Sequence, residues 1–260
     1  MILLFTVFNF FREARLLVLD SAKYSICLFV SLFSFSVFCG ESLPFFNAYY
    51  TIQKSGVSFS NIRISYYKKG KHFFYESETQ TNDFYSWIQD RNLLEKSQWN
   101  VVNHQIKPIK YQYTYYSNKN QRKVDLLFNW DDHIVKNTVG KKSWLLDINS
   151  QTQDKLSSQI ALIQQLSKKD DEKSFKFSVA DGGKLKSYQY VIIGEEEIAT
   201  ALGNYQAIKV ELTKNNKITN TVIWFAPKLN YIPIAIQRKK YGINYNINIV
   251  QLDWLNVENK

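Results

Sequence analysis

The sequence predicts an all-β protein, mainly antiparallel, built as a strongly curved sheet or barrel-like meander with one inserted amphipathic helix. Aromatic residues make up 16% of the 260 residues, and such side chains suit a pleated, half-buried surface. From residue 41 onward the dominant hydrophobic period is two, which is typical of antiparallel strands with one solvated face. One long segment, residues 153–168, breaks this pattern and has helical spacing.

Composition narrows the class of protein before any motif is considered. Apolar residues make up 45% and charged residues 22%, which excludes a disordered or collagen-like chain. The length allows a sizeable core, and two Cys cannot build a disulfide scaffold. The formal net charge is +10, from 33 basic and 23 acidic residues, and only six of the basic residues are Arg.

The N-terminus resembles a secretory signal peptide over residues 1–39. Lys23 precedes an apolar run of about 15 residues, which is too short to span a bilayer, and small residues follow it at Cys39 and Gly40. Cleavage after Cys39 leaves one β-rich envelope domain, residues 40–260, in the periplasm. Two alternatives remain open: acylation of Cys39 as a lipoprotein, although Phe38 stands where a small residue is wanted, and an uncleaved membrane anchor.

Alternating segments define roughly twelve to fourteen strands, an estimate that rests on the two-residue period. The clearest are residues 174–179, 206–213 and 244–249, and Tyr111, Tyr113 and Tyr115 share one face of another. Turn signals separate the strands at residues 69–71, 117–120, 181–183, 214–217 and 241–242. This spacing predicts a string of hairpins, and a sheet of so many strands is expected to curl.

The helix is predicted over residues 153–168. Leu156, Ile160 and Ile163 recur at helical spacing, and Thr152 or Asp154 can cap the start by accepting backbone N–H bonds. We expect this helix to cover the concave face of the curled sheet. A second, shorter helix is predicted around residues 82–89.

Few residues suggest catalysis. His133 follows Asp131 and Asp132, an order that would suit a base oriented by a carboxylate, but the chain has no Gly-x-Ser-x-Gly segment to supply a nucleophile. The favoured interpretation of residues 129–133 is a strand end or turn.

Metal and phosphate sites are not predicted either. Glu195, Glu196 and Glu197 are read as a solvated hairpin turn rather than a calcium site. His72, His104 and His133 lack zinc spacing, and Gly182 and Gly183 lack the residues of a phosphate-binding loop. No catalytic, metal-binding or cofactor-binding residue is therefore assigned.

Lys and Tyr interleave at residues 66–69, 110–116 and 238–241. In a cytosolic protein this pattern would suggest nucleic acid. Because the chain is expected to be exported, nucleic acid is set aside, and anionic lipid head groups or polysaccharide become the corresponding partners. The favoured interpretation, however, is a solubilising Lys-rich face with Tyr as half-buried strand residues.

Five segments in order resemble an uncharacterised exported family of bacteria, domain-of-unknown-function family 3108. The segments are residues 44–50 followed by Gly56, 128–130, 153–157, 200–205 and 224–233. Asn129 stands where the family often has Asp, and Ser60 where a second Gly is common. The resemblance implies an envelope location and a β-rich fold, carries no accepted activity and transfers no catalytic residue. In these segments we interpret Trp130 and Trp224 as large anchors whose indole N–H groups need a hydrogen-bond partner, and Pro227 and Pro233 as brackets of an irregular link.

The functional expectation is a non-catalytic binding or scaffold module for a lipid-like ligand or an envelope protein partner, with no cofactor. Its binding groove is expected beside the helix, lined by strand aromatics with Lys at the rim. The alternative is a hydrolase of an envelope polymer that uses Asp131, Asp132 and His133, or Glu195, Glu196 and Glu197. Membrane contact is expected only through an uncleaved N-terminus.

Overall fold

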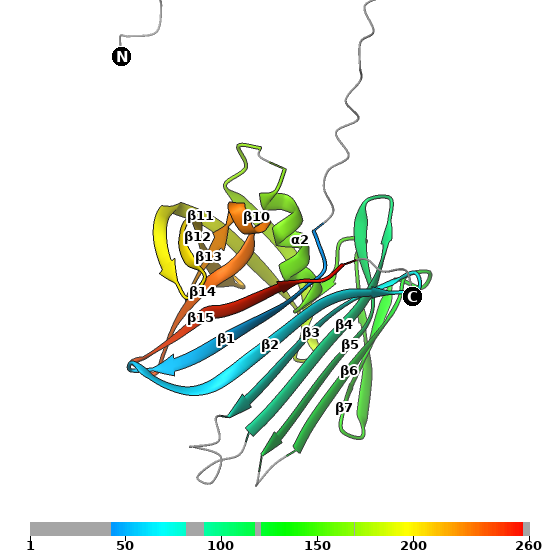
Figure 1. Ribbon diagram of the computed structural model, residues 1–260. Coiled ribbons are helices and arrows are strands. Elements are labelled where there is room, and N and C mark those ends of the chain that lie inside the picture. The colour runs from blue at the N-terminus through cyan, green and yellow to red at the C-terminus, as the bar shows by residue number, and fades with distance from the viewer. Residues whose placement is uncertain (1–42, 82–90, 118–120, 169, 257–260) are drawn as a thin grey trace, which may run out of the picture. The chain divides into compact units, whose positions relative to one another are not determined.

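The computed structural model describes residues 43–81, 91–117, 121–168 and 170–256. These residues form one 15-stranded sheet, the helix α2 (Ser157–Leu166) and the short 3-10 helix η1 (Pro227–Leu229) (Figure 1). The strands are β1 (Phe46–Lys54), β2 (Val57–Lys69), β3 (His72–Thr81), β4 (Arg91–Val102), β5 (Gln105–Ser117), β6 (Gln121–Asn129), β7 (Ile134–Val139), β8 (Lys142–Asp147), β9 (Gln153–Asp154), β10 (Ser174–Asp181), β11 (Lys184–Thr200), β12 (Gly203–Lys214), β13 (Lys217–Ala226), β14 (Ile232–Lys240) and β15 (Ile243–Trp254).

The sheet consists of two meanders that meet in its middle. Strands β1 to β8 form the N-terminal arm and β10 to β15 the C-terminal arm, and within each arm consecutive strands pair antiparallel. The arms are joined by the antiparallel pair β1–β15. The two edges of the sheet are therefore β8 and β9, which are neighbours in the sequence, and β9 pairs parallel with β10.

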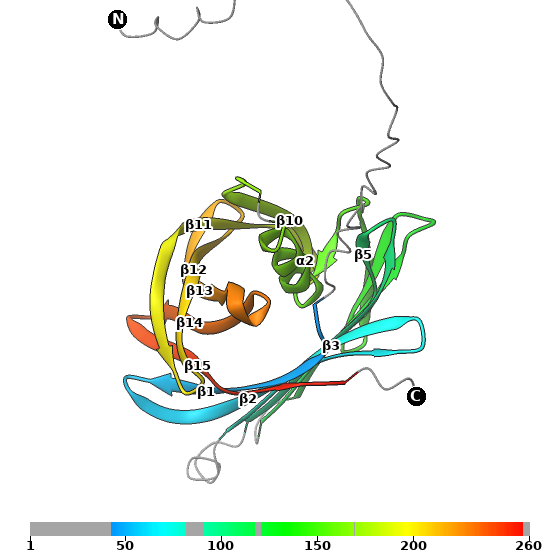
Figure 2. The same ribbon diagram turned by 45° about the horizontal axis from the view of Figure 1, so that its top comes forward.

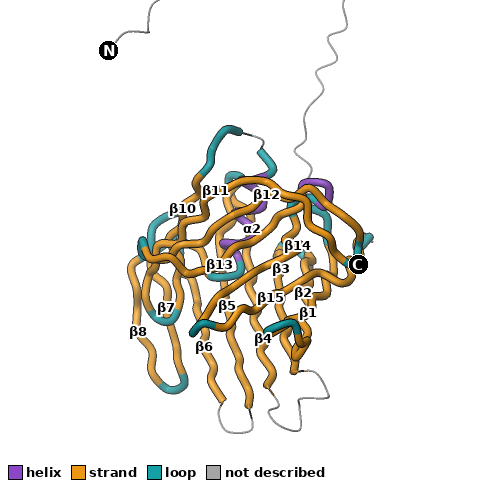
Figure 3. Tube along the Cα trace, turned by 90° about the vertical axis from the view of Figure 1, so that its left-hand side faces the viewer, coloured by secondary structure: helices purple, strands orange, loops and turns teal. Residues whose placement is uncertain are grey.

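The sheet curls so that its two ends come together around α2 (Figures 2 and 3). Trp144 on β8 donates its indole N–H to the carbonyl of Gly183, in the turn between β10 and β11, at 2.9 Å. Gly183 has φ +79°, and a Cβ there would lie 2.1 Å from the Trp144 ring. Only glycine therefore fits both this turn and this close approach.

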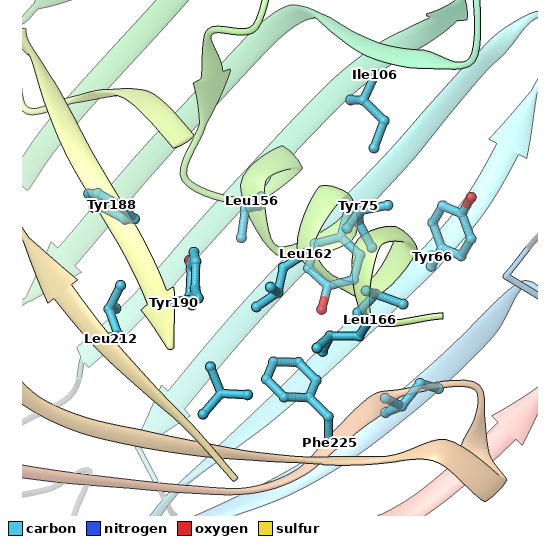
Figure 4. Packing of buried hydrophobic residues seen from close by; sticks show 14 of the residues in the cluster. Tyr66, Tyr75, Ile106, Leu156, Leu162, Leu166, Tyr188, Tyr190, Leu212 and Phe225 are labelled. Atoms are coloured by element: carbon cyan, nitrogen blue, oxygen red, sulfur yellow. The ribbon is translucent and has the colours of Figure 1, made fainter. Parts of the chain in front are cut away.

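The core lies on the concave face, where α2 packs against both arms (Figure 4). Tyr75 and Trp99 come from the N-terminal arm, Tyr190 and Phe225 from the C-terminal arm, and Leu162 from the helix; each is buried. Inward residues alternate with outward ones along strands such as β1 and β5, as the two-residue period predicts. In β14, by contrast, the four consecutive residues 232–235 are all buried. The fold class predicted from sequence is confirmed, with one more strand than the upper estimate.

The helix is confirmed but shorter than predicted, because residues 153–154 pair as β9 and 155–156 form a turn. Asp154 still caps it: its Oδ1 accepts from the backbone N–H groups of Leu156 at 2.8 Å and Ser157 at 2.9 Å. Ile160 and Leu162 are buried on different sides of α2 and only Gln164 is exposed, so the helix is enclosed rather than laid across a surface. The second predicted helix, residues 82–89, lies outside the described residues.

The link between β13 and β14 differs in part from the prediction. Pro227 begins η1, as expected of a residue that cannot continue a strand. Pro233 instead lies inside β14, opposite Phe225, next to a register shift at which sheet pairing is already irregular. Its carbonyl accepts a hydrogen bond from the Tyr50 hydroxyl at 2.9 Å, which ties β14 to β1.

Candidate binding site: a lysine cluster on the concave face

The first candidate catalytic group forms an exposed turn, as the favoured interpretation held. Asp131, Asp132 and His133 connect β6 to β7, and all three are exposed. The Asn129 side-chain oxygen accepts from the backbone N–H groups of Asp131 and Asp132, both at 3.1 Å. His133 Nδ1 lies 3.3 Å from the Asp131 backbone carbonyl rather than against a carboxylate. Asn129 is thus a turn-forming residue, a role that Asp can also fill.

The second candidate group does not form the predicted hairpin turn. Glu195, Glu196 and Glu197 lie within the 17-residue strand β11, so neighbouring carboxylates point to opposite faces and cannot converge on one ion. Glu196 accepts a hydrogen bond from the Trp224 indole and pairs with Lys209 Nζ at 3.1 Å, and these contacts lower the pKa of Glu196. The turn was predicted because Gly194 precedes the acids; this glycine instead sits at a register shift.

The three histidines lie in separate parts of the described sheet. His72 begins β3, while His104 and His133 lie in the turns β4–β5 and β6–β7. Within residues 43–81, 91–117, 121–168 and 170–256, no three His, Cys, Asp or Glu side chains gather closely enough to hold a metal ion. No helix within these same residues combines the length and the apolar character needed to cross a bilayer.

A polar group on the N-terminal arm faces the concave side at Lys155, between β9 and α2. Lys155 Nζ lies 2.5 Å from Glu95 Oε1 on β4, and the Tyr111 hydroxyl on β5 donates to the same oxygen. The Lys155 ammonium is also 5.5 Å from the centroid of the Tyr113 ring. The Lys155 side chain keeps 30% of its surface exposed and Glu95 13%, so the pair is shielded but reachable by solvent.

A second group comes from the C-terminal arm. Asp181 Oδ2 on β10 accepts from Lys186 Nζ at 2.8 Å and from the Tyr188 hydroxyl at 2.9 Å, both on β11. Lys214, at the end of β12, donates to the Tyr188 hydroxyl at 2.8 Å and lies 4.2 Å from the centroid of that ring. Tyr188 therefore separates Lys214 from the carboxylate that Lys186 already occupies.

The two groups act on one another electrostatically across the concave face. Burial and the charge of Glu95 raise the pKa of Tyr111 far above its usual range, and Asp181 of the opposite arm adds to this rise. Burial and Asp181 likewise raise the pKa of Tyr188, and Glu95 adds to it. Both tyrosines therefore stay protonated and serve as hydroxyl donors. We call Lys155, Lys186 and Lys214 the interior lysine cluster.

Lys214 is the least compensated cation of the interior lysine cluster. Burial lowers its pKa to about 8; the charge of Asp181 opposes this shift, while those of Lys155, Arg238 and Lys186 reinforce it. Among the described residues, Lys214 has no carboxylate oxygen within 4 Å, whereas Lys155 and Lys186 each have one. An anion placed beside Lys214 would restore its preference for the charged form.

Open space borders the cluster. A hollow of about 280 Å³ is lined by Phe177 and Lys186, and also by Leu185 and Ser187, which alternate with Lys186 along β11 and so face outward. Phe177 is half-buried and its ring lies 5.9 Å from that of Tyr190. One aromatic ring, that of Phe177, and the Lys186 side chain thus both border this hollow, and none of the residues that line it belongs to α2.

The sequence pattern predicted two tyrosines of this site but not its lysines. The Lys/Tyr segment 110–116 contributes Tyr111 and Tyr113, whereas Tyr241 of segment 238–241 is 90% exposed in a turn. One signal was present: Lys186, Tyr188 and Tyr190 occupy alternate positions and so share the inward face of β11. Nothing in the sequence pattern marked Lys155 and Lys214, because only the curl of the sheet brings them close enough to Lys186 for their charges to interact.

Comparisons with known proteins identify a family and a fold. The family model described as "Protein of unknown function (DUF3108)" matches residues 46–247, which confirms the resemblance found in the sequence motifs. The crystal structure of a β-barrel-like protein of domain of unknown function DUF1849 from Brucella abortus is similar, with a TM-score of 0.55 and 11% identity, over 84% of this chain and 100% of that chain. At this identity the likeness shows the fold alone. No curated protein matches the chain.

Proposed function

Because the chain belongs to the family of proteins of unknown function DUF3108, we propose a function from its own site: an exported periplasmic binding module for a lipid-like ligand with an anionic head group. The interior lysine cluster binds the head group, and the half-buried rings beside it contact the start of the apolar tail. The proposal assigns no catalytic step and no cofactor.

The observation that carries the proposal is the state of Lys214. Its half-buried ammonium donates to a neutral tyrosine, and the two lysines near it already hold carboxylates. A shielded cation without a counterion is costly for the folded protein. A bound anion offsets that cost, since charge-assisted hydrogen bonds are stronger than those between neutral groups.

The neighbouring surface supports an apolar tail. Tyr113 and Phe177 are partly buried and pack against the hydrophobic core rather than pointing to bulk solvent. Phe177 also lines the hollow that Lys186 borders. Ligand sites of this kind are mostly apolar with a few polar groups that fix orientation.

Titration with a fluorescent fatty acid at moderate salt tests the binding proposal. We expect saturable binding by the purified protein, and a loss of roughly fivefold or more in affinity for Lys214→Gln, which removes the charge but keeps a donor. Lys136→Gln is the matched control, because Lys136 is exposed on β7. Equal weakening by both substitutions would point to general charge attraction and contradict the assigned site.

Binding should also depend on pH. Because Lys214 has a pKa of about 8, we expect affinity for the anionic probe to fall between pH 7 and pH 9 as the ammonium loses its proton. The uncharged alcohol of the same chain length should bind with no such dependence. A fatty-acid affinity that is flat across this range would exclude Lys214 as the head-group ligand.

Export is supported by the apolar run and small residues before residue 40. Cell fractionation with N-terminal sequencing should find a mature form that begins between residues 37 and 43 in the envelope fraction. Full-length protein in the cytosol would overturn this part of the proposal.

Mass spectrometry of the native protein, extracted gently from the envelope, separates a ligand from a protein partner. We expect a co-purifying lipid-like molecule whose occupancy falls in the Lys214→Gln variant. A stoichiometric envelope protein without lipid would replace the ligand-binding proposal with a scaffold function.

A further inference from the structure

A second hollow lies on the outer face of the sheet, away from the interior lysine cluster. Its volume is about 450 Å³, and it spans four neighbouring strands, β15, β1, β2 and β3. Tyr49, Asn61 and Arg63 contribute to its lining. Asn61 and Arg63 alternate along β2 with Ile62 and Ile64, which pack against the core, so this part of the hollow faces outward.

A β-bulge explains why the outer face is hollowed here. In the β1–β15 pair, Tyr49 faces Gln251 and Tyr50 faces Ile249, which leaves Val250 as an extra residue on β15. Such an insertion bends its strand and redirects the neighbouring side chains. Val250 itself lines the hollow, so the irregularity and the hollow occupy the same place.

The charges in the lining cancel. Arg63 Nη2 on β2 lies 2.8 Å from Glu78 Oε2 on β3, directly opposite in the strand register. The other polar lining residues are two tyrosines, Tyr49 and Tyr50, and three amides, those of Asn61, Gln80 and Gln251. This surface is polar and rich in hydrogen-bonding groups without net charge, in contrast to the interior lysine cluster.

Several of these groups are unused. Within the described residues, the Tyr49 hydroxyl and the Asn61 amide make no side-chain hydrogen bond, and Gln80 engages only its nitrogen, with Glu78 at 2.8 Å. Arg63 keeps donors beyond the one that meets Glu78. Donors and acceptors are therefore both available around a half-buried aromatic ring.

We propose that this hollow binds a neutral oligosaccharide. A pyranose ring offers hydroxyl groups that match amide and guanidinium groups, and C–H groups that pack on the face of an aromatic ring such as Tyr49. The volume is within the range of small-molecule sites. An anionic ligand is disfavoured, because Glu78 would repel it and already neutralises Arg63.

The inference is independent of the proposed lipid binding, since the two sites use opposite faces and different residues. Isothermal titration of the purified protein with chitotetraose, cellotetraose and maltotetraose tests it. We expect saturable binding of at least one of them. Tyr49→Ala should weaken that binding about tenfold or more, whereas Tyr49→Phe should keep most of it because the ring face remains.

Two further variants keep the test decisive. Asn61→Ala changes an exposed side chain and should weaken binding severalfold without affecting the fold, and Tyr241→Ala, in a distant exposed turn, should leave it unchanged. Absence of binding to all three tetrasaccharides would overturn the proposal. So would equal affinities of the wild type, Tyr49→Ala and Asn61→Ala, since binding would then lie elsewhere.

Discussion

The concave face has two regions of opposite character, although the same strands build both. Around α2 it is dry: Trp99 on β4 and Tyr190 on β11 are 1% and 3% exposed. Glu95 lies four residues before Trp99 on β4, and Lys186 lies four residues before Tyr190 on β11, so both point to the same concave face. Glu95 is paired with Lys155 and Lys186 with Asp181, and all four side chains are partly solvated. The two-residue period of a strand determines whether a side chain points to the concave or the outer face. The part of the concave face that α2 covers is the part from which water is excluded.

Asp154 lies at the boundary between the dry region around α2 and the polar region of ion pairs, and its hydrogen bonds connect α2 to β4. It is fully buried, caps α2 with one carboxylate oxygen, and accepts from the Ser97 hydroxyl of β4 with the other at 2.6 Å. Burial raises the pKa of Asp154, although these hydrogen bonds oppose the rise. The next residue, Lys155, already belongs to the polar region.

Introducing a charge into the dry region should reduce the free energy of unfolding more than any other change considered below. Ile160 is 1% exposed on α2, so Ile160→Asp loses its burial and introduces an unpaired charge, at a cost of about 4 kcal/mol or more. Thermal unfolding measures this. The control Gln164→Asp changes the exposed position of the same helix and should cost less than about 1 kcal/mol. Similar melting temperatures for both variants would show that α2 is not enclosed.

Removing the boundary carboxylate should have the next largest effect. Asp154→Ala leaves the Ser97 hydroxyl and two backbone N–H groups without their acceptor, which should reduce the free energy of unfolding by about 3 kcal/mol. Asp154→Asn retains one acceptor oxygen for the cap and should cost less. Chemical denaturation of the two variants tests the order, and a larger loss for Asn would contradict the capping role.

Neutralising the polar region should instead stabilise the protein. The pKa of Lys214 is about 8 in the folded state, below its usual value of about 10.4. Between these values the unfolded chain binds more protons, so stability rises with pH in this window. Lys214→Gln should therefore be more stable than wild type at pH 7, by about 1 kcal/mol, and the difference should shrink by pH 10. A difference that is constant with pH would contradict the assigned shift.

The smallest expected effect is the coupling within the ion pair at Lys155. A double-mutant cycle with Lys155→Gln and Glu95→Gln should give an interaction free energy of about 0.5–1 kcal/mol, because Lys155 keeps part of its surface in water. Denaturation at low and high salt measures it, and the coupling should fall at high salt. A coupling of several kcal/mol would mean that the polar region is as dry as the core.

Local pattern was enough to predict the elements but not their ends. Alternation such as Phe175, Phe177 and Val179 identified the strands, and the Leu156, Ile160 and Ile163 spacing identified α2. The start of the helix was placed four residues early because Gln153 and Asp154 pair with β10 instead. Pairing is a tertiary contact, and it overrides the helical pattern at that end.

The sites were harder to predict because they depend on curl and on irregular pairing. Lys155 and Lys214 are far apart in the sequence, and only closure of the sheet brings their charges together. The hollow at Tyr49 depends on the extra residue Val250, whose bulge has no sequence signal. The predicted turn at residues 195–197 was wrong because of irregular pairing too. Gly194 marks a register shift inside the long strand β11 and not the start of a turn.

Strands β1 and β15 are the first and last described strands in sequence, yet they pair in the middle of the sheet. The middle of the sheet, rather than its edge, can therefore form only last. Phe46 at the start of β1 is paired with Trp254 at the end of β15, and just beyond this pair the Leu255 N–H donates to the Phe45 carbonyl at 2.8 Å. During synthesis each arm can form its local hairpins, but β1 lacks its second partner until β15 arrives. Because such long-range contacts form slowly, the interval before closure leaves two long strand edges unpaired. A chaperone that shields β1 would act at that stage, and shortening the chain by its last strand would split the sheet in two instead of trimming it.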